Sequence, residues 1–261
     1  MAAVDSFQFL YREISRSCSS YFEALALVGA VYATRRAVVL LRACCTVVRV
    51  HFLPRMMPSG KLTQRYGDWA VIYGASEPVA RAYAEELAQN GVSIIFITQD
   101  SSSLRDIVAF LTQTYGVETS VVTANFSLGQ AAGMVERSRG AVVNISSGAC
   151  CRPQHGRVTL AAFTGYLDNF SRALHFEYSD KGIFVQSLIP LQIASSRHQP
   201  SSPREGWFVP SPEVYASHAI STLGVSNRTT GYWPHTLQYG LIRCIPEWIW
   251  IFVSRVVLSA T

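Results

Sequence analysis

Residues 69–98 read WAVIYGASEPVARAYAEELAQNGVSIIFIT, and this stretch decides the fold. It begins with an apolar run over residues 69–73 and ends with a second over 92–98, as expected for parallel strands that are buried on both faces. Between them, residues 78–89 predict a helix that Asn90 and Gly91 end. A strand, a glycine-containing turn, a helix and a second strand form the start of a dinucleotide-binding domain.

The turn departs from that pattern. It spans residues 74–80 and reads GASEPVA, so two of the three positions that carry glycine in a dinucleotide-binding loop hold other residues. The sequence thus keeps the scaffold of a nicotinamide-dependent enzyme but alters its chemistry. This combination favours a degenerate oxidoreductase.

The strand and helix pattern continues towards the C-terminus. We predict a helix over residues 103–115, capped by Ser103 and ended by Gly116. Further strands are predicted over residues 118–123, 141–145 and 183–189, and a long helix over 160–178. The Ser- and Pro-rich residues 192–212 predict a mobile loop. The expected fold class is α/β, a Rossmann-type doubly wound parallel sheet.

Composition narrows the class further. A chain of 261 residues with 49% hydrophobic residues can bury the core of one ordinary α/β domain. Its six cysteines include two adjacent pairs but no C-x-x-C spacing, so neither a disulfide framework nor a metal site is expected.

The N-terminal part of the chain is basic and apolar. Residues 24–67 contain no Asp or Glu and seven Lys or Arg. A membrane span needs about 20 apolar residues, and Arg35 and Arg36 interrupt any such window, so a simple span is doubtful. Arg35, Arg42 and Arg49 are seven residues apart and predict an amphipathic helix with one basic face.

We interpret residues 1–60 as a targeting or membrane-interacting segment and residues 61–261 as the α/β domain, with residues 54–60 as the linker. Residues 24–55 would bind an anionic membrane surface or act as an Arg-rich import signal. A helix packed on the domain with its arginines in water is the alternative. Nucleic-acid binding is not expected, because the basic residues lie in an apolar background.

Four stretches carry a family resemblance. They are YGAS at residues 73–76, AYAEELA at 82–88, VVNISSG at 142–148 and KGIFVQSLIP at 181–190. They resemble the short-chain dehydrogenases/reductases, and within them the branch of 17β-hydroxysteroid dehydrogenases and 3-oxoacyl-CoA reductases. The resemblance covers nearly the whole chain apart from one large gap. It implies a Rossmann domain, an NADP cofactor and catalysis by a serine and a Tyr-x-x-x-Lys pair.

The catalytic positions are altered. Ser147 matches the family serine, but Phe163 stands in place of the tyrosine and Leu167 in place of the lysine. A phenylalanine ring has no proton to donate to a developing alkoxide. Tyr166 is a poor substitute, because Phe170 follows it at the lysine spacing and a packing role is expected instead.

The cofactor positions are altered as well. Pro78 removes an N–H from the phosphate-binding loop, and the methyl group of Ala80 lies where the family has only hydrogen. Gln99 replaces the arginine of NADP-preferring relatives, and Asn125 replaces the aspartate that binds adenine. The vestigial cofactor-binding positions are therefore Gly74, Ala75, Ser76, Glu77, Pro78, Val79, Ala80 and Asn125.

The family's central strand, with its Asn-Asn-x-Gly motif, has no counterpart between Asn125 and Met134. At about 30 residues for each strand-helix-strand unit, the missing piece is on the order of 60 residues. We therefore expect residues 69–73 to pair directly with residues 141–145, which would leave a marginally stable domain. A splice product and a gene-model artefact are both open explanations of the gap.

The sequence favours a catalytically inactive member of the family with weak or no NADP binding. A residual NADP-dependent hydroxysteroid or 3-oxoacyl-CoA oxidoreductase and an interaction or scaffold protein are the alternatives. The resemblance favours the mitochondrion, with the endoplasmic reticulum membrane second. A protein partner and a homodimer are both open.

Overall fold

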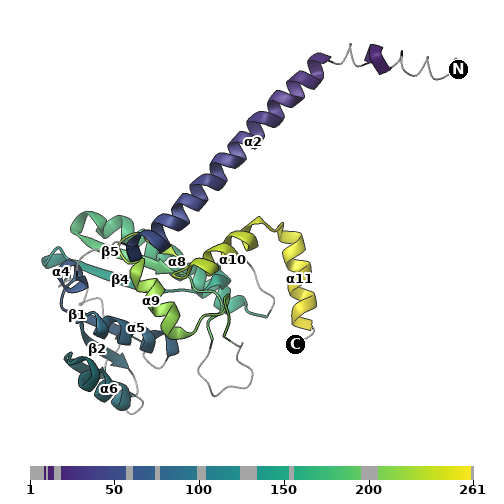
Figure 1. The fold of residues 1–261 in the computed structure, drawn as a ribbon. Helices are drawn as coiled ribbons and strands as arrows, with labels where there is room; N and C mark the ends of the chain where they lie inside the picture. The colour runs from purple at the N-terminus through teal and green to yellow at the C-terminus, as the bar shows by residue number, and fades with distance from the viewer. Residues whose placement is uncertain are drawn as a thin grey trace. The chain divides into compact units, whose positions relative to one another are not determined.

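The computed structural model describes residues 9, 11–14, 19–56, 61–73, 77–98, 104–123, 134–152, 156–194 and 205–259. The chain divides into two compact units, Met1–Val48 and Arg49–Thr261, earlier than the boundary expected at residue 60. Figure 1 shows their elements. The N-terminal unit is a helix, and the second unit is the α/β domain.

The first half of the domain is a parallel sheet with helices between its strands. In chain order it contains β1 (Trp69–Tyr73), α5 (Pro78–Gln89), β2 (Ser93–Thr98), α6 (Arg105–Tyr115) and β3 (Thr119–Thr123). The spatial order is β1-β2-β3, with Trp69 opposite Ser93 and Ile94 opposite Thr119. These bounds confirm the predicted elements to within two residues. Gly116 ends α6 at φ 67°, a left-handed conformation that glycine adopts without strain.

The second half is another parallel sheet. This half of the domain contains β4 (Gly140–Ile145), η3 (Gly148–Cys151), α8 (Val158–Tyr178), η4 (Ser179–Lys181), β5 (Ile183–Leu188) and the short β6 (Arg228–Thr229). Helix α4 (Leu62–Tyr66), which precedes β1 in the chain, also contacts β4. The order is β4-β5-β6, and Gly140 lies opposite Ile183. Helix α8 begins two residues earlier than predicted and ends where predicted.

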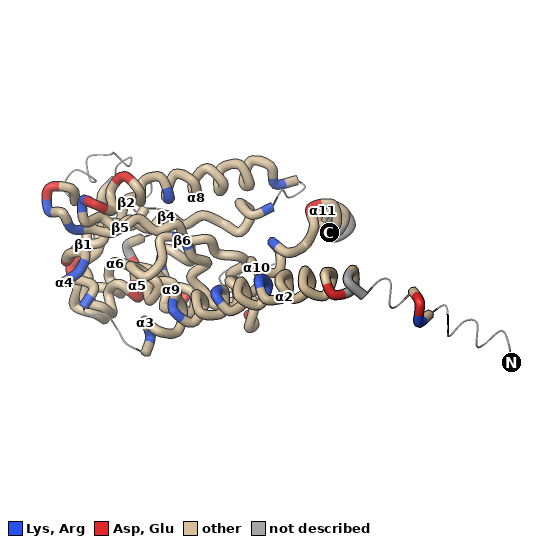
Figure 2. The backbone as a smooth tube through the Cα atoms, turned by 90° about the horizontal axis from the view of Figure 1, so that it is seen from above, with Lys and Arg blue, Asp and Glu red and all other residues tan. Residues whose placement is uncertain are grey.

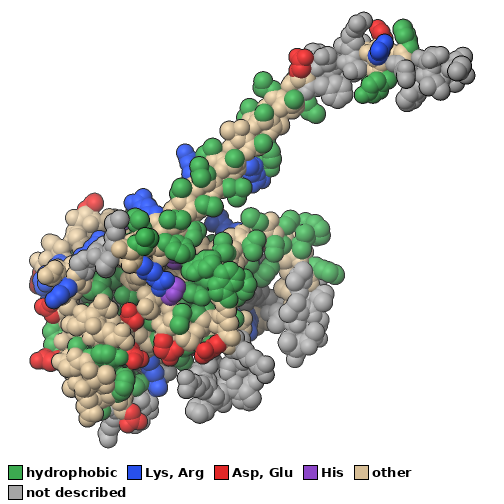
Figure 3. Space-filling view, viewed as in Figure 1, with side chains coloured by type: hydrophobic (Ala, Val, Ile, Leu, Met, Phe, Trp, Pro, Cys, Tyr) green, Lys and Arg blue, Asp and Glu red, His purple; other side chains and the backbone are tan. Residues whose placement is uncertain are grey.

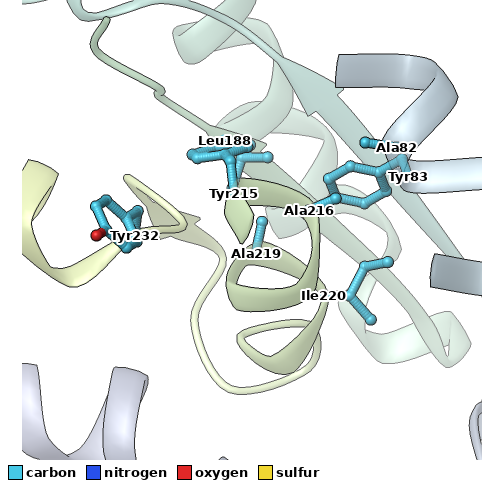
Figure 4. Close-up of a cluster of buried hydrophobic side chains, with 8 residues drawn as sticks. All are labelled: Ala82, Tyr83, Leu188, Tyr215, Ala216, Ala219, Ile220 and Tyr232. Carbon is cyan, nitrogen blue, oxygen red and sulfur yellow. The ribbon is translucent and has the colours of Figure 1, made fainter. Parts of the chain in front are cut away.

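The expected direct pairing of β1 with β4 is wrong. Within the described residues β1 pairs only with β2, and β4 only with β5, so the two sheets share no ladder. Side chains join them instead: α5 contacts α9 (Pro212–Ser221), and Tyr83, Leu188 and Tyr215 are buried in one cluster (Figure 4). The contact between the two halves is therefore made by side chains and not by the backbone hydrogen bonds of a ladder.

The C-terminal helices were not predicted individually. They are α9, α10 (Trp233–Cys244) and α11 (Glu247–Ser259), and α11 contains the apolar tail of residues 248–257. Part of the loop predicted over residues 192–212, namely 195–204, lies outside the described residues, as does Ser103. Residues 206 and 209 pair in a short antiparallel bridge at its end.

The N-terminal unit corrects one sequence interpretation. Helix α2 (Ser19–Val47) is followed by a π-helical turn, η1 (Val48–Phe52), and by α3 (Leu53–Met56). Arg49 lies in the π-helical turn, so its spacing from Arg42 does not continue the α-helical face. The consecutive residues 38–41 are all apolar and all exposed, so the helix is apolar on every side. Figure 2 shows basic but no acidic residues along α2 after Glu23.

By length and composition, the helix over Glu23–Met56 could cross a membrane; its most apolar window has a mean hydropathy of 1.6. The sequence argument considered such a span doubtful because of Arg35 and Arg36. A continuous helix of 34 residues, about 50 Å long, exceeds the hydrocarbon thickness of roughly 30 Å, which leaves length for arginine side chains to reach the headgroups.

Candidate active site and cofactor loop

Ser147 lies where the carboxyl ends of β4 and β5 meet. The backbone N–H of Ser146 donates to Leu188 O at 2.7 Å, and that of Gly148 donates to Pro190 O at 2.7 Å. Ser147 caps η3, and its Oγ accepts a hydrogen bond from the Ala149 N–H at 3.4 Å. The half-buried Ser147 therefore lies at the carboxyl edge of the sheet, and the hydrogen bond of its side chain stays within its own loop.

Phe163 offers no acid at this site. Its ring, on α8, is 61% exposed. The buried face of α8 is formed by Thr164, Asp168 and Ser171. Thr164 directly follows Phe163, and Asp168 directly follows Leu167, so the buried face lies beside the two catalytic positions of the family. Leu167 is half-buried, and its carbonyl accepts from Ser171 Oγ at 2.7 Å. Neither side chain can transfer a proton.

Tyr166 takes a packing role, as expected. It is 61% exposed and stacks on Phe170, with ring centroids 5.6 Å apart and ring planes 18° apart. The ring thus forms part of an outer aromatic face of α8.

The cofactor loop is described only in part. Gly74, Ala75, Ser76, Gln99 and Asn125 lie outside the described residues. Pro78 stands in the first turn of α5, which confirms that it serves as a helix-starting residue. Ala80 is buried at 7% exposure, so its methyl group fills space on the inner side of the helix, and Val79 is half-buried.

Glu77 adds an electrostatic obstacle that sequence reasoning did not weigh. It is the N-cap residue of α5, is exposed, and makes no side-chain cap to its own helix. The N-terminus of this helix is where the pyrophosphate of a dinucleotide would bind, because unpaired N–H groups and the helix dipole favour anions there. A carboxylate in this position repels the phosphates, while Pro78 removes one of the donors.

Comparison with known proteins identifies the family. A sequence model for short chain dehydrogenases matches residues 119–206. Inactive hydroxysteroid dehydrogenase-like protein 1 of Danio rerio is 44% identical over 319 residues, which cover 100% of this chain and 100% of that protein. The chain belongs to the short-chain dehydrogenase family. The comparison spans 319 positions against 261 residues here, so 58 positions have no residue in this chain.

Solved structures of short-chain dehydrogenases confirm the Rossmann-type fold. A structure from a study of 7β-hydroxysteroid dehydrogenase stereoselectivity has a TM-score of 0.55 and 20% identity, and covers 65% of this chain and 89% of its own. L-sorbose reductase from Gluconobacter frateurii, complexed with NADPH and L-sorbose, has a TM-score of 0.52 and 15% identity, and covers 65% of this chain and 97% of its own. At such identities the likeness concerns the fold alone.

In this short-chain dehydrogenase, the buried polar residues around α8 form an ion-pair network that sequence reasoning missed. Arg228 Nη2 lies 2.9 Å from Asp168 Oδ2, and Ser187 Oγ donates to Asp168 Oδ1 at 2.7 Å. Burial raises the pKa of Asp168, but the hydrogen bonds from Arg228 and Ser187 outweigh it and leave the pKa below its usual value. The network ties α8 to β5 and β6.

Two adjacent thiols follow Ser147 in η3. Cys150 and Cys151 are both half-buried, near Arg228 and Tyr239. Hydrogen bonds with Cys150 and Tyr239 lower the pKa of Cys151 to about 7, against the opposing effect of burial. The shared hydrogen bond, together with burial, raises the pKa of Cys150. The pair therefore holds one thiolate near neutral pH.

Proposed function

We propose that this chain is a catalytically inactive short-chain dehydrogenase that binds NADP weakly or not at all. The exposed ring of Phe163 carries the proposal, because it stands where the family places its proton donor. Loss of a general acid costs about 10²- to 10⁴-fold in rate, and the lysine that would assist it is also replaced, by Leu167. The Danio rerio relative is named as an inactive protein, which supports the same conclusion.

The proposed weak or absent binding of NADP follows from the residues at the N-terminus of α5. Glu77 and Pro78 replace a neutral donor-rich loop by a carboxylate and a residue without an N–H, and Ala80 fills the space of a glycine. NADP carries three phosphate groups, so a repulsive helix N-terminus weakens its binding more than that of a neutral ligand.

A combined assay tests both parts. NADPH oxidation with steroid ketones and with a 3-oxoacyl-CoA should equal the no-protein background in the wild type and in Ser147→Ala. Calorimetry should detect no NADPH binding at micromolar concentrations. Turnover that disappears in Ser147→Ala would instead support a residual NADP-dependent hydroxysteroid or 3-oxoacyl-CoA oxidoreductase, and micromolar affinity would refute the argument from the loop.

The double variant Phe163→Tyr/Leu167→Lys separates the two losses. It restores the family pair on α8 and leaves the altered loop, so its turnover should stay at background. Recovered turnover would show that the cofactor site is intact and that only the catalytic pair is lost. Circular dichroism on the same sample verifies that the lysine at the half-buried position of Leu167 has not unfolded the helix.

A second candidate is an interaction or scaffold role. Phe163, Tyr166 and Phe170 lie on one side of α8 and are 61%, 61% and 39% exposed. Exposed aromatic groups of this kind are typical of protein contact surfaces, including contacts between identical chains. Light scattering of the wild type and of Tyr166→Ser would show whether the face joins two copies; an unchanged monomer mass in both would leave no support for a homodimer through α8.

We further propose that residues 24–55 attach the protein to a membrane, in the mitochondrion or, as the alternative, in the endoplasmic reticulum. The apolar surface of α2 on every side and the absence of acids over residues 24–67 support attachment. The family resemblance supports the choice of organelle. Fractionation of cells that express the full chain tests it, and recovery in the soluble fraction would contradict it.

A further inference from the structure

A second apolar surface belongs to the α/β domain itself. Its large side chains are 41–69% exposed and come from three segments: residues 52–53, the turn at 205–209, and α10. We call them the aromatic surface, and they are Phe52, Leu53, Trp207, Phe208, Leu237 and Leu241. Figure 3 shows hydrophobic side chains gathered over α10 and the adjoining α11, where Trp248 is 73% exposed.

The aromatic surface is held in a fixed arrangement. The rings of Trp207 and Phe52 each contact Trp233 of α10, with centroids 5.2 Å and 5.9 Å away. The turn that carries Trp207 is closed by two backbone hydrogen bonds between Gly206 and Val209, at 2.9 and 3.0 Å. Its carbonyl at Trp207 accepts from the Tyr232 hydroxyl at 3.2 Å. These contacts place large apolar groups in solvent at positions that the fold itself determines.

Segment 49–56 joins this surface to the apolar helix. His51 is buried, and its Nε2 lies 2.9 Å from Thr236 Oγ1 of α10, so the segment is docked on the domain. Phe52 belongs both to the aromatic surface and to the candidate span Glu23–Met56. It follows Val47, the last residue of α2, by five positions, a rise of about 7 Å in helical geometry. The short chain connection between α2 and Phe52 therefore limits how far the aromatic surface can move from a membrane that receives α2.

The residues at the edge of the surface fit the polar zone of a bilayer. Three exposed arginines adjoin the surface in sequence, namely Arg49, Arg55 and Arg243. Two exposed acids, Glu205 and Glu247, do so as well, so basic residues are in excess. Tryptophan is enriched at headgroup depth because its ring is apolar and its N–H is polar, and arginine binds anionic headgroups there. Tryptophan and arginine are also enriched at protein interfaces, so the short chain connection to the apolar helix α2 is what favours a membrane as the partner of this surface.

We propose that the aromatic surface lies in the headgroup region of the membrane that receives α2, with anionic phospholipid as its ligand. The inference rests on the proposed attachment through residues 24–55. The α/β domain then has a fixed face towards the bilayer and does not tumble freely on the linker. Burial of the exposed apolar groups supplies the free energy, at about 25 cal/mol for each Å² removed from water.

Fluorescence quenching tests the proposal on the full chain. The protein is reconstituted into vesicles of phosphatidylcholine and phosphatidylserine, with lipids brominated at shallow acyl positions as the quencher. Three of the five tryptophans, Trp207, Trp233 and Trp248, lie on or beside the surface, so we expect at least a one-third loss of tryptophan emission. No quenching by shallow brominated lipid in the wild type would overturn the proposal.

Leu237→Glu/Leu241→Glu is the decisive variant. Both side chains are exposed, so the domain should fold, and quenching should fall at least twofold while co-sedimentation with vesicles persists through α2. Phe176→Glu is the matched control, because Phe176 is 79% exposed on α8, and it should quench as the wild type does. Equal quenching in all three proteins would overturn the inference.

Two further outcomes are informative. Loss of co-sedimentation in the wild type itself would contradict the proposed attachment through α2 and not the surface alone, so the two failures are distinguishable. If the wild type is unquenched but dimeric in detergent, and Leu237→Glu/Leu241→Glu is monomeric, the surface is an interface between copies and the lipid proposal is refuted.

Discussion

Substitution of His235 should remove a large part of the acid sensitivity of the domain. His235 is fully buried in the first turn of α10. The Leu191 N–H donates to its Nδ1 at 3.4 Å, and its Nε2 lies 3.2 Å from Gln192 O, so the neutral ring with a proton on Nε2 satisfies both partners. Protonation would place a second N–H against that of Leu191.

Burial lowers the pKa of His235 from 6.5 to about 4, although backbone hydrogen bonds at Phe208 and Gln192 oppose the shift. The unfolded chain therefore takes up this proton near pH 6.5 and the folded chain only near pH 4, so stability falls as pH falls through that window. At 1.36 kcal/mol for each pH unit, His235 alone costs about 2 kcal/mol between pH 7 and pH 5.

Guanidinium denaturation of the full chain in a neutral detergent measures this, with tryptophan fluorescence as the signal. His235→Gln keeps one donor and one acceptor but does not titrate, so its loss of stability between pH 7 and pH 5 should be about 2 kcal/mol smaller than in the wild type. His51 and His218, whose pKa values burial also lowers to about 4, are present in both proteins and cancel. The reasoning fails if both proteins lose the same free energy over this interval.

Three further substitutions test other parts of the structure. Asp168→Asn should lower the free energy of unfolding by about 2–3 kcal/mol, because the 31% exposed side chain of Arg228 loses its partner. The effect should decrease as pH falls below 3.8, the ordinary pKa of this carboxyl, and be lost as pH passes the lower pKa of the folded state; a cost under about 0.5 kcal/mol at neutral pH would show that the pair is not structural. The rate of maleimide labelling at Cys151 should rise with pH through a midpoint near 7. If Cys150→Ala moves this midpoint to about pH 9, the hydrogen bond with Cys150 alone lowers the pKa of Cys151. The triple variant Arg35→Glu/Arg42→Glu/Arg49→Glu should become extractable from membranes by carbonate, since acids in an apolar helix cost several kcal/mol in a bilayer. If the variant resists extraction as well as the wild type does, the anchor lies elsewhere, in α11.

Local elements of the fold could be predicted from sequence because their signals are local. The apolar run at residues 69–73 and the glycine after α6 specify a strand and a helix end through their own side chains and backbone freedom. The ion pair of Asp168 and Arg228 joins residues 60 positions apart, and the periodicity of apolar residues in the sequence does not predict such a contact. Whether α2 spans a membrane stays a prediction, because its length and composition allow a span while Arg35 and Arg36 interrupt the apolar window.

The catalytic positions were predicted residue by residue and the cofactor loop only in outline. Ser147 could be located because a strand end fixes its place at the sheet edge. The role of Glu77 was missed, since its effect depends on where α5 begins, which is a property of the folded backbone. The separation of the two sheets was also missed, because which strands pair across a long gap in sequence is a property of the folded chain and has no local sequence signal.

The separation of the sheets has a consequence for cooperativity. Because β1-β2-β3 and β4-β5-β6 share side chains but no backbone ladder, either half can open while the hydrogen bonds of the other stay intact. Amide hydrogen exchange would then show two plateaus of protection, with the amides of β2 exchanging independently of those of β5. A Rossmann domain with an unbroken sheet has a backbone ladder from edge to edge, whereas the two halves of this domain are coupled through side chains, Tyr83 and Tyr215 among them.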